Sequence, residues 1–171
     1  MLDRHIFIIG MPGSGKSSLG KRVAKELGVP FTDTDELVAR TIDGTVNDFF
    51  TRYGEQAFRK AETNMLTELT RARPMIVSTG GGTVINPVNR KIMRNWGIIL
   101  LNDRPLEDIL GDIKLDRRPT LREGGLDAVR EVYETRYPVY RSAADLILRN
   151  DQGYQAAVVN MIRMIRERFG V

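Results

Sequence analysis

One short segment constrains the fold of this chain more than any other. Residues 10–17 read GMPGSGKS and match the pattern G-x-x-x-x-G-K-[ST]. An apolar stretch at 5–9 precedes this segment, and a helical pattern at 16–27 follows it. The glycines let the backbone curl until successive N–H groups point inward, and the N-terminus of the helix adds positive charge beside them. A glycine turn that holds nothing would not need this context, so the segment predicts a strand, a phosphate-binding loop and a helix.

Short apolar segments alternate with longer segments of helical period along the chain. The apolar segments are rich in β-branched residues and too short for helices, which is typical of strands covered on both faces. They lie at 5–9, 29–32, 75–78, 97–101 and 146–148, and the clearest helical patterns lie at 16–27, 55–71, 87–95 and 154–169. The alternation predicts an α/β fold with a buried parallel sheet. Because a typical domain has about 150 residues, we expect a single domain over 1–171.

The composition excludes several kinds of chemistry. The chain has no cysteine, so it has no disulfide, no thiolate metal site and no cysteine nucleophile. Its one histidine, His5, begins an apolar strand, where a structural role is the simpler interpretation. No apolar run approaches the roughly 18 residues of a membrane span, and the N-terminus lacks the order of a signal peptide. We therefore expect a cytoplasmic protein with no membrane partner.

The charge of the chain is only weakly basic. Lys and Arg number 26 against 22 Asp and Glu, which gives +4 at pH 7. Aromatic residues make up 7% of the chain and do not accompany the basic runs, as they do where single-stranded nucleic acid stacks on a protein. We expect a monomer with no nucleic-acid partner. A nucleotide-binding or nucleic-acid-associated protein without catalytic activity stays an alternative.

The loop at 10–17 indicates its own ligands. Lys16 supplies a mobile positive charge for the β and γ phosphates, and Ser17 presents a hydroxyl to Mg²⁺. A nucleoside triphosphate with Mg²⁺ is the expected pair. The acceptor stays open at this point, because switches that use water and kinases that use a hydroxyl both contain such a loop. A GTP switch would also show an Asn-Lys-x-Asp stretch, which this sequence does not have in a suitable place.

Polar motifs follow the second and third predicted strands. Asp33 and Asp35 lie in the stretch FTDTDE at 31–36, and TGGG at 79–82 follows the third strand. Strand ends of a doubly wound sheet face the ligand crevice, where such carboxylates hold metal ions or hydroxyl groups. The alternative is that Asp33 caps the next helix. Two further motifs, FRKAE and RYPVY, have simple interpretations alone, as a helix-surface arginine and the end of a helical pattern.

Taken together, the motifs resemble those of the shikimate kinase family. The loop at 10–17, DTD at 33–35, FRKAE at 58–62, TGGG at 79–82, Arg-Pro at 118–119 and RYPVY at 136–140 occur in the order and at the intervals of that family. The resemblance implies a P-loop NTPase fold of the nucleoside-monophosphate-kinase type, with a five-stranded parallel sheet flanked by helices and a mobile lid. It also implies transfer of the γ-phosphate of ATP to the 3-hydroxyl of shikimate, which gives shikimate 3-phosphate for aromatic amino-acid biosynthesis.

The resemblance also assigns roles to single residues. Asp35 is expected to bind the acceptor hydroxyls and Asp33 to reach Mg²⁺ through water, while Arg59 and Arg136 hold the shikimate carboxylate. Planar guanidinium groups suit a planar carboxylate. The expected catalytic residues are Lys16, Asp35 and Arg118, and the expected metal-site residues are Ser17 and Asp33. The expected nucleotide site comprises Gly13, Ser14, Gly15, Lys16, Ser17, Ser18 and Arg118, and the expected substrate site comprises Asp35, Arg59, Gly80, Gly81, Gly82 and Arg136.

The stretch KLDRRPTLREGG at 114–125 departs from the alternating pattern. It is mostly charged and has almost nothing to bury, so we expect a mobile surface loop, the lid, over about 112–125. Closure would bring Arg118 to the phosphates and exclude water. The arginine that packs on adenine near the start of the lid in the family is absent here. Lys114, Arg117 and the loop at 149–153 are the remaining candidates for the adenine contact.

The identity of the acceptor depends on one spatial prediction. Arg59 and Arg136 must converge with Asp35 on a cavity that faces the triphosphate. A kinase for another small hydroxy acid, such as gluconate, stays an alternative. Whether Asp35 takes a proton or only orients the attacking hydroxyl also stays open, because a loose transition state needs little early deprotonation.

Overall fold

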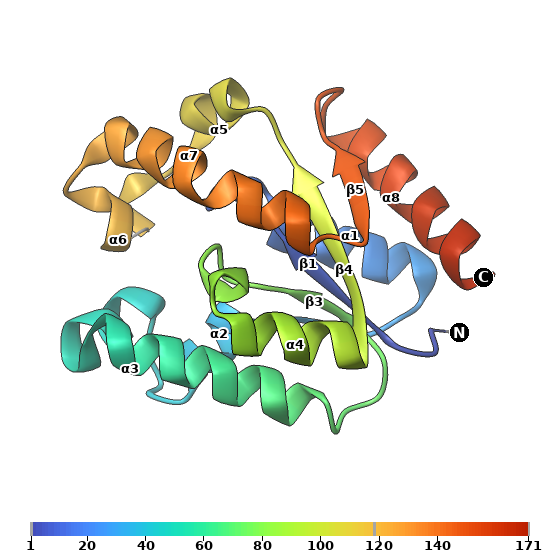
Figure 1. Ribbon diagram of the computed structural model, residues 1–171, viewed down its shortest axis with the longest axis horizontal. Coiled ribbons are helices and arrows are strands. Elements are labelled where there is room, and N and C mark those ends of the chain that lie inside the picture. Colours follow the sequence, from blue (N-terminus) through green and yellow to red (C-terminus); the bar gives the residue numbers. More distant parts are fainter. Residues whose placement is uncertain (1, 118, 171) are drawn as a thin grey trace.

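The computed structural model describes residues 2–117 and 119–170 of the chain. Its centre is a five-stranded parallel sheet in the order β2-β3-β1-β4-β5 (Figure 1). The strands are β1 (His5–Ile9), β2 (Phe31–Asp33), β3 (Ile76–Ser78), β4 (Gly97–Asp103) and β5 (Leu146–Arg149). Because β1 pairs with β3 on one side and β4 on the other, the winding of the sheet reverses at β1. Ligands bind at such a reversal, and residues 10–17 leave the sheet there.

Helices cover both faces of this sheet (Figure 1). Ile6 and Ile8 of β1 belong to one apolar cluster, and Phe7 and Ile9 belong to another, as the alternation of side chains along a strand requires. The first cluster is covered by α1 (Lys16–Leu27) and α8 (Tyr154–Phe169), and the second by α3 (Val46–Leu69), α4 (Pro87–Trp96) and α7 (Gly125–Ala143). Shorter elements connect them, namely α2 (Thr34–Arg40), α5 (Leu106–Asp112), α6 (Pro119–Arg122) and the 3₁₀ turns η1 (Thr83–Ile85) and η2 (Leu115–Arg117). Among the described residues, none of these helices combines the length and the apolar character needed to span a bilayer.

The sheet and its flanking helices confirm the expected fold, and the bounds of β1, α1 and α8 are those predicted. Two helices are longer than predicted. The helix α3 begins at Val46, where Thr45 and Asp48 form a capping box, and a non-helical Gly54 interrupts its period. The helix α7 does not end within the RYPVY motif but continues past Pro138 to Ala143. Its last turns stay helical because Tyr140 and Ala143 are buried in the core.

The expectation that residues 114–125 form a loop with little to bury is wrong. The segment contains η2 and α6, and Leu121 is only 2% exposed. Leu121 packs in the same apolar cluster as Val129 and Tyr140. The two leucines of this segment, Leu115 and Leu121, are six residues apart among charged residues and give no helical period, which is why the sequence pattern did not reveal this anchor. The movement of the lid stays a prediction.

We expect Leu121→Ala to lower the free energy of unfolding by about 2 kcal/mol, as burial of a leucine in a packed core implies. The control is Leu126→Ala, because Leu126 lies in the adjoining first turn of α7 but is 44% exposed. Urea unfolding of both variants measures the difference. Equal stability of the two variants would show that Leu121 is not held in the core in solution.

Candidate active site

The carboxyl ends of β1, β2 and β3 meet at one edge of the sheet. In the paired strands Ile8 lies beside Ser78, and Ser78 lies beside Asp33. A cavity of about 570 Å³ opens at this edge. The predicted site residues that line it are Gly13, Gly15, Lys16, Ser17, Ser18, Asp33, Asp35 and Gly81. The strand order therefore brings together the phosphate loop, the aspartates and the glycine motif.

The phosphate loop is wrapped around the side chain of Lys16. Its Nζ atom donates hydrogen bonds to the carbonyl oxygens of Gly10 (2.9 Å) and Met11 (2.8 Å), and the residue is 7% exposed. Gly13 and Gly15 have positive φ angles of 79° and 83°, which other residues rarely adopt. Gly15 precedes α1, and no side chain of the described residues caps that helix. The first N–H groups of α1 consequently face the cavity side of the loop and suit phosphate oxygens.

The rest of the sheet holds the loop in place. Asn102, at the end of β4, is 1% exposed and donates from Nδ2 to the carbonyl oxygen of Ser14 (2.7 Å). The Oγ atom of Ser18 donates to the carbonyl oxygen of Gly15 (3.1 Å), and the hydroxyl of Tyr154 donates to the carbonyl oxygen of Ser18 (3.1 Å). The predicted nucleotide residues Ser14 and Ser18 are thus fixed to β4 and α8.

The two predicted metal-site residues lie in direct contact. The hydroxyl of Ser17 donates to Oδ2 of Asp33 at 2.5 Å and lies 3.2 Å from the hydroxyl of Ser78. The other carboxylate oxygen of Asp33 accepts hydrogen bonds from the backbone N–H groups of Asp35 (2.9 Å) and Glu36 (3.3 Å). One oxygen of Asp33 therefore caps α2, as the alternative interpretation predicted, and the other contacts Ser17. The metal role of Asp33 stays a prediction.

The glycine turn at 80–82 lies against Asp35. The backbone N–H of Gly80 donates to the hydroxyl of Thr34 (3.2 Å). A Cβ atom at Gly80 would come within 2.5 Å of Oδ1 of Asp35 and 2.6 Å of Oε1 of Glu62, so only glycine fits. Asp35 itself is in the first turn of α2. The sequence predicted Asp35 and Gly80 as substrate residues, and the structure places them in close contact.

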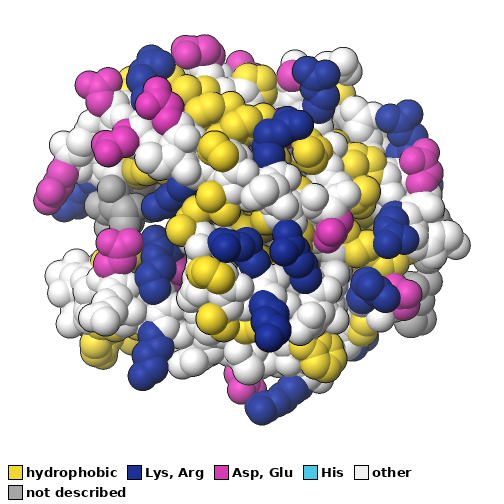
Figure 2. Space-filling model, viewed as in Figure 1, with side chains coloured by type: hydrophobic (Ala, Val, Ile, Leu, Met, Phe, Trp, Pro, Cys, Tyr) yellow, Lys and Arg dark blue, Asp and Glu magenta, His cyan; other side chains and the backbone are white. Residues whose placement is uncertain are grey.

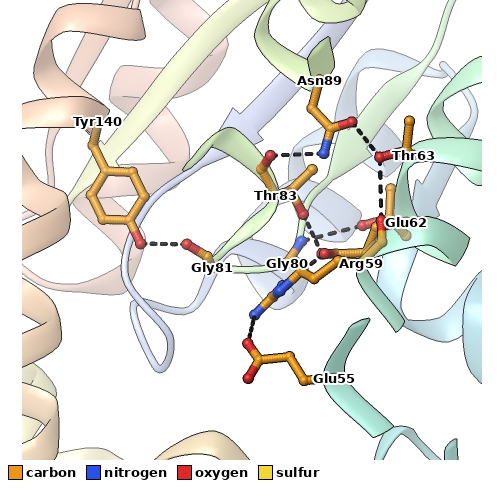
Figure 3. A network of polar contacts seen from close by, with 10 residues as sticks. Glu55, Arg59, Glu62, Thr63, Gly80, Gly81, Thr83, Asn89 and Tyr140 are labelled. Carbon is orange, nitrogen blue, oxygen red and sulfur yellow. Dashed lines mark hydrogen bonds and ion pairs between the residues drawn. The ribbon is translucent and has the colours of Figure 1, made fainter. Parts of the chain in front are cut away.

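Arg59 is held on α3 by two carboxylates (Figure 3). Its Nη1 atom donates to Glu62 at 2.7 Å, and its Nη2 atom donates to Glu55 at 3.3 Å. Glu62 is fully buried, and its second oxygen accepts from the hydroxyl of Thr83 at 2.5 Å. Burial disfavours the charged guanidinium, but the ion pair with Glu62 outweighs this effect and raises the pKa of Arg59. The guanidinium plane packs against Gly82, where a Cβ atom would lie 2.6 Å from Nη1.

Arg59 and Arg136 line one cavity of about 380 Å³, together with Gly82 and the start of α4. Asp35 and Gly81 line the larger cavity beside the phosphate loop. The glycine turn lies between the two cavities, because Gly81 lines the larger one and the next residue, Gly82, lines the smaller one. The structure thus brings the two arginines together and places Asp35 across the turn from them. Figure 2 shows Lys and Arg side chains gathered over the middle of one face, where Figure 1 places α4.

Arg118 lies outside the described residues. Sequence reasoning quoted Glu62 within FRKAE without a role, although its spacing of three from Arg59 on a helix is that of an ion pair. It missed Arg104, whose Nη1 atom donates to the carbonyl oxygen of Gly13 (3.4 Å) and whose Nη2 atom pairs with Asp112. No sequence pattern marked Arg104, because these contacts come from the packing of the end of β4 on the loop.

Comparisons with known proteins agree with this geometry. A family model described as shikimate kinase matches residues 12–166. The chain is 42% identical to a shikimate kinase of Paracidovorax citrulli, over 97% of this chain and 93% of that protein. It is 38% identical to a shikimate kinase of Clostridium beijerinckii, over 97% of this chain and 95% of that protein.

A solved structure extends the agreement to three dimensions. The shikimate kinase from Acinetobacter baumannii in complex with shikimate matches with a TM-score of 0.88 and 30% identity, over 98% of this chain and 93% of that chain. The family model covers residues 12–17 of the phosphate loop together with the aspartates, the glycine turn and the paired arginines. The protein described here is accordingly a member of the shikimate kinase family.

Proposed function

We propose that this enzyme transfers the γ-phosphoryl group of ATP to the 3-hydroxyl of shikimate. The observation that carries the proposal is the shared cavity of Arg59 and Arg136, which lies across a glycine turn from the phosphate loop. An acceptor held there by its carboxylate would extend its hydroxyl groups toward Asp35. The two guanidinium groups that line this cavity would also attract an anionic acceptor.

Two guanidinium groups suit the carboxylate of the acceptor. Each can donate parallel hydrogen bonds to a planar carboxylate, and such charge-assisted pairs are stronger than neutral ones. Glu62 and Glu55 fix Arg59 in advance, so little side-chain entropy is lost when the acceptor binds. The fully buried Glu62 keeps Arg59 oriented toward Gly82 rather than toward solvent.

Phosphoryl transfer needs positioned charge more than covalent catalysis. Lys16 would exchange its bonds to Gly10 and Met11 for bonds to phosphate oxygens, while the N-terminus of α1 holds the remaining oxygens. Asp35 would orient the attacking hydroxyl. Arg118 would reach the phosphates when the lid closes over them.

Ser17 and Asp33 fit a Mg²⁺ ion that accompanies the nucleotide. Both supply oxygen atoms, which are the ligands that Mg²⁺ prefers, and they lie in contact at the cavity wall. Ser17 would hold the ion directly and Asp33 through water. When bound, the ion would neutralise phosphate charge.

The base of the nucleotide would occupy a third cavity, of about 220 Å³, on the other side of the phosphate loop. Arg104 and Tyr154 line it with Asn150 and Gly153, which belong to the loop that the sequence proposed for this purpose. Arg104 would then supply the guanidinium that the family carries near the start of the lid. A single chain provides every group named here, so we expect the enzyme to act as a monomer.

The test is a coupled assay of ADP release with ATP, Mg²⁺ and a panel of acceptors. We expect turnover with shikimate, a product phosphorylated at the 3-hydroxyl by phosphorus NMR, and no acceleration by gluconate. Release of ADP at the same rate without any acceptor would favour a nucleotide-binding protein with a weak hydrolase activity. Equal turnover with gluconate and shikimate would overturn the proposed acceptor.

A further inference from the structure

Tyr140 contacts the glycine turn from the side opposite to Arg59 (Figure 3). It lies on α7, four residues after Arg136 and therefore on the same face of the helix. Its side chain is completely buried, and its hydroxyl donates to the carbonyl oxygen of Gly81 at 2.5 Å (Figure 3). This contact joins residues 59 positions apart in the sequence.

The same hydroxyl lies in the field of both substrate arginines. Burial raises the pKa of Tyr140 to about 12, against the opposing effects of the charge and hydrogen bond of Arg136 and the charge of Arg59. The phenol therefore stays protonated at working pH and can donate to Gly81 while its oxygen faces Arg136. One buried oxygen atom thus lies between an arginine of the acceptor cavity and the glycine turn.

The glycine turn at 80–82 is also tightly packed on the side that faces the phosphate loop. A Cβ atom at Gly81 would lie 2.7 Å from Cδ and Cγ of Pro12, within the phosphate loop. Gly80 is held in turn by the hydroxyl of Thr34. A change in the position of the Gly81 carbonyl would consequently be passed to both cavities, because Gly81 lines one and Gly82 the other.

We propose that Tyr140 is a positioning residue that fixes Arg136 relative to the glycine turn. An acceptor held by its carboxylate then presents its hydroxyl to the phosphate site. This role rests on the proposed function. It assigns a task to the last residue of the RYPVY motif, and Tyr140 does this without touching the substrate.

The test replaces Tyr140 by phenylalanine, which keeps the ring and removes the hydroxyl. We expect the KM for shikimate to rise about tenfold, the loss expected for one buried hydrogen bond, with the KM for ATP unchanged. The control is Tyr137→Phe, one turn earlier on α7, whose hydroxyl donates to Asp103 at 3.0 Å, outside the acceptor cavity. Its KM values should both stay at the wild-type level.

The outcomes separate the inference from the proposed function. Wild-type enzyme that does not phosphorylate shikimate rejects both. Wild-type turnover with an unchanged KM for shikimate in Tyr140→Phe, or equal rises of both KM values, rejects the positioning role alone. A drop in Tm without a change in KM would show a merely structural hydroxyl.

A second variant covers the case in which Tyr140→Phe does not fold. A fluorinated tyrosine at position 140 keeps the shape of the side chain but has a more acidic hydroxyl. It loses its proton at a pH where the phenol of the wild-type residue, with its pKa of about 12, keeps it. We expect its KM for shikimate to rise about tenfold at high pH relative to wild type at the same pH, as for loss of one hydrogen bond. A KM that follows the wild-type profile overturns the assignment.

Discussion

We expect Lys16→Met to lower kcat/KM for ATP by about 1,000-fold, the upper range for loss of one positioned charge at a transferring phosphate. Methionine keeps an unbranched side chain of similar length, so the variant removes the charge with little change in packing. Lys16 is 7% exposed and already bonded to two carbonyl oxygens of the loop. The ammonium group is thus placed before any ligand binds, and catalysis would use this arrangement.

The same substitution has a matched control on the next turn of α1. Lys21→Met removes a charge from the same helix, but Lys21 is exposed to solvent. We expect wild-type kinetics for Lys21→Met and similar thermal unfolding of both variants. Steady-state rates with varied ATP, and ATP binding by calorimetry, provide the measurements. A loss of less than tenfold in Lys16→Met would mean that backbone N–H groups alone stabilise the transferring group.

Much of the sheet and the phosphate loop could be predicted because their signals are local. The loop at 10–17 carries its glycines, lysine and serine in one segment, and the apolar runs around it lead to β1 and α1 with the expected bounds. The helix α2 was predicted only as the alternative interpretation of Asp33. It has seven residues, and its capping signal at Asp33 lies inside a motif that also suits metal binding. A functional motif can therefore be recognised when its residues are contiguous in the sequence. The role of a single residue such as Asp33, which suits both a helix cap and a metal site, stays ambiguous.

Contacts between distant elements could not be derived from local patterns. The resemblance to a family suggested that Arg59 and Arg136 meet, but nothing around either residue indicates their common cavity. The contact of Tyr140 with Gly81 and the burial of Leu121 depend on how α7 crosses the second face of the sheet. The RYPVY motif at 136–140 even suggested that this helix ends earlier. The packing of Tyr140 and Ala143 in the core stabilises the last turns of α7, and it places Tyr140 at the glycine turn.

Substitution of Asp35 is also expected to cause a large loss of activity. We expect Asp35→Ala to lower kcat/KM for shikimate by about 1,000-fold, because the attacking hydroxyl would lose the group that orients it. Asp35 lines the cavity beside Lys16 and also lies against Gly80, so it borders both the phosphate loop and the glycine turn. Coupled assays with varied shikimate measure the change.

Glu36→Gln is the matched control, because Glu36 is the next residue in the first turn of α2 and is exposed. Its backbone N–H, like that of Asp35, donates to Asp33, so the cap of the helix is the same in both variants. We expect Glu36→Gln to keep wild-type rates. Similar losses in both variants would indicate a general effect of charge near the crevice rather than contact with the acceptor.

Asp35→Asn distinguishes the two roles that the sequence left open. An asparagine oxygen can still accept a hydrogen bond from the attacking hydroxyl, but it cannot take up the proton. If orientation is the main contribution, Asp35→Asn keeps far more activity than Asp35→Ala. If the carboxylate takes the proton, both variants lose activity to the same extent. Because a loose transition state leaves the hydroxyl proton in place until late, we expect the first result.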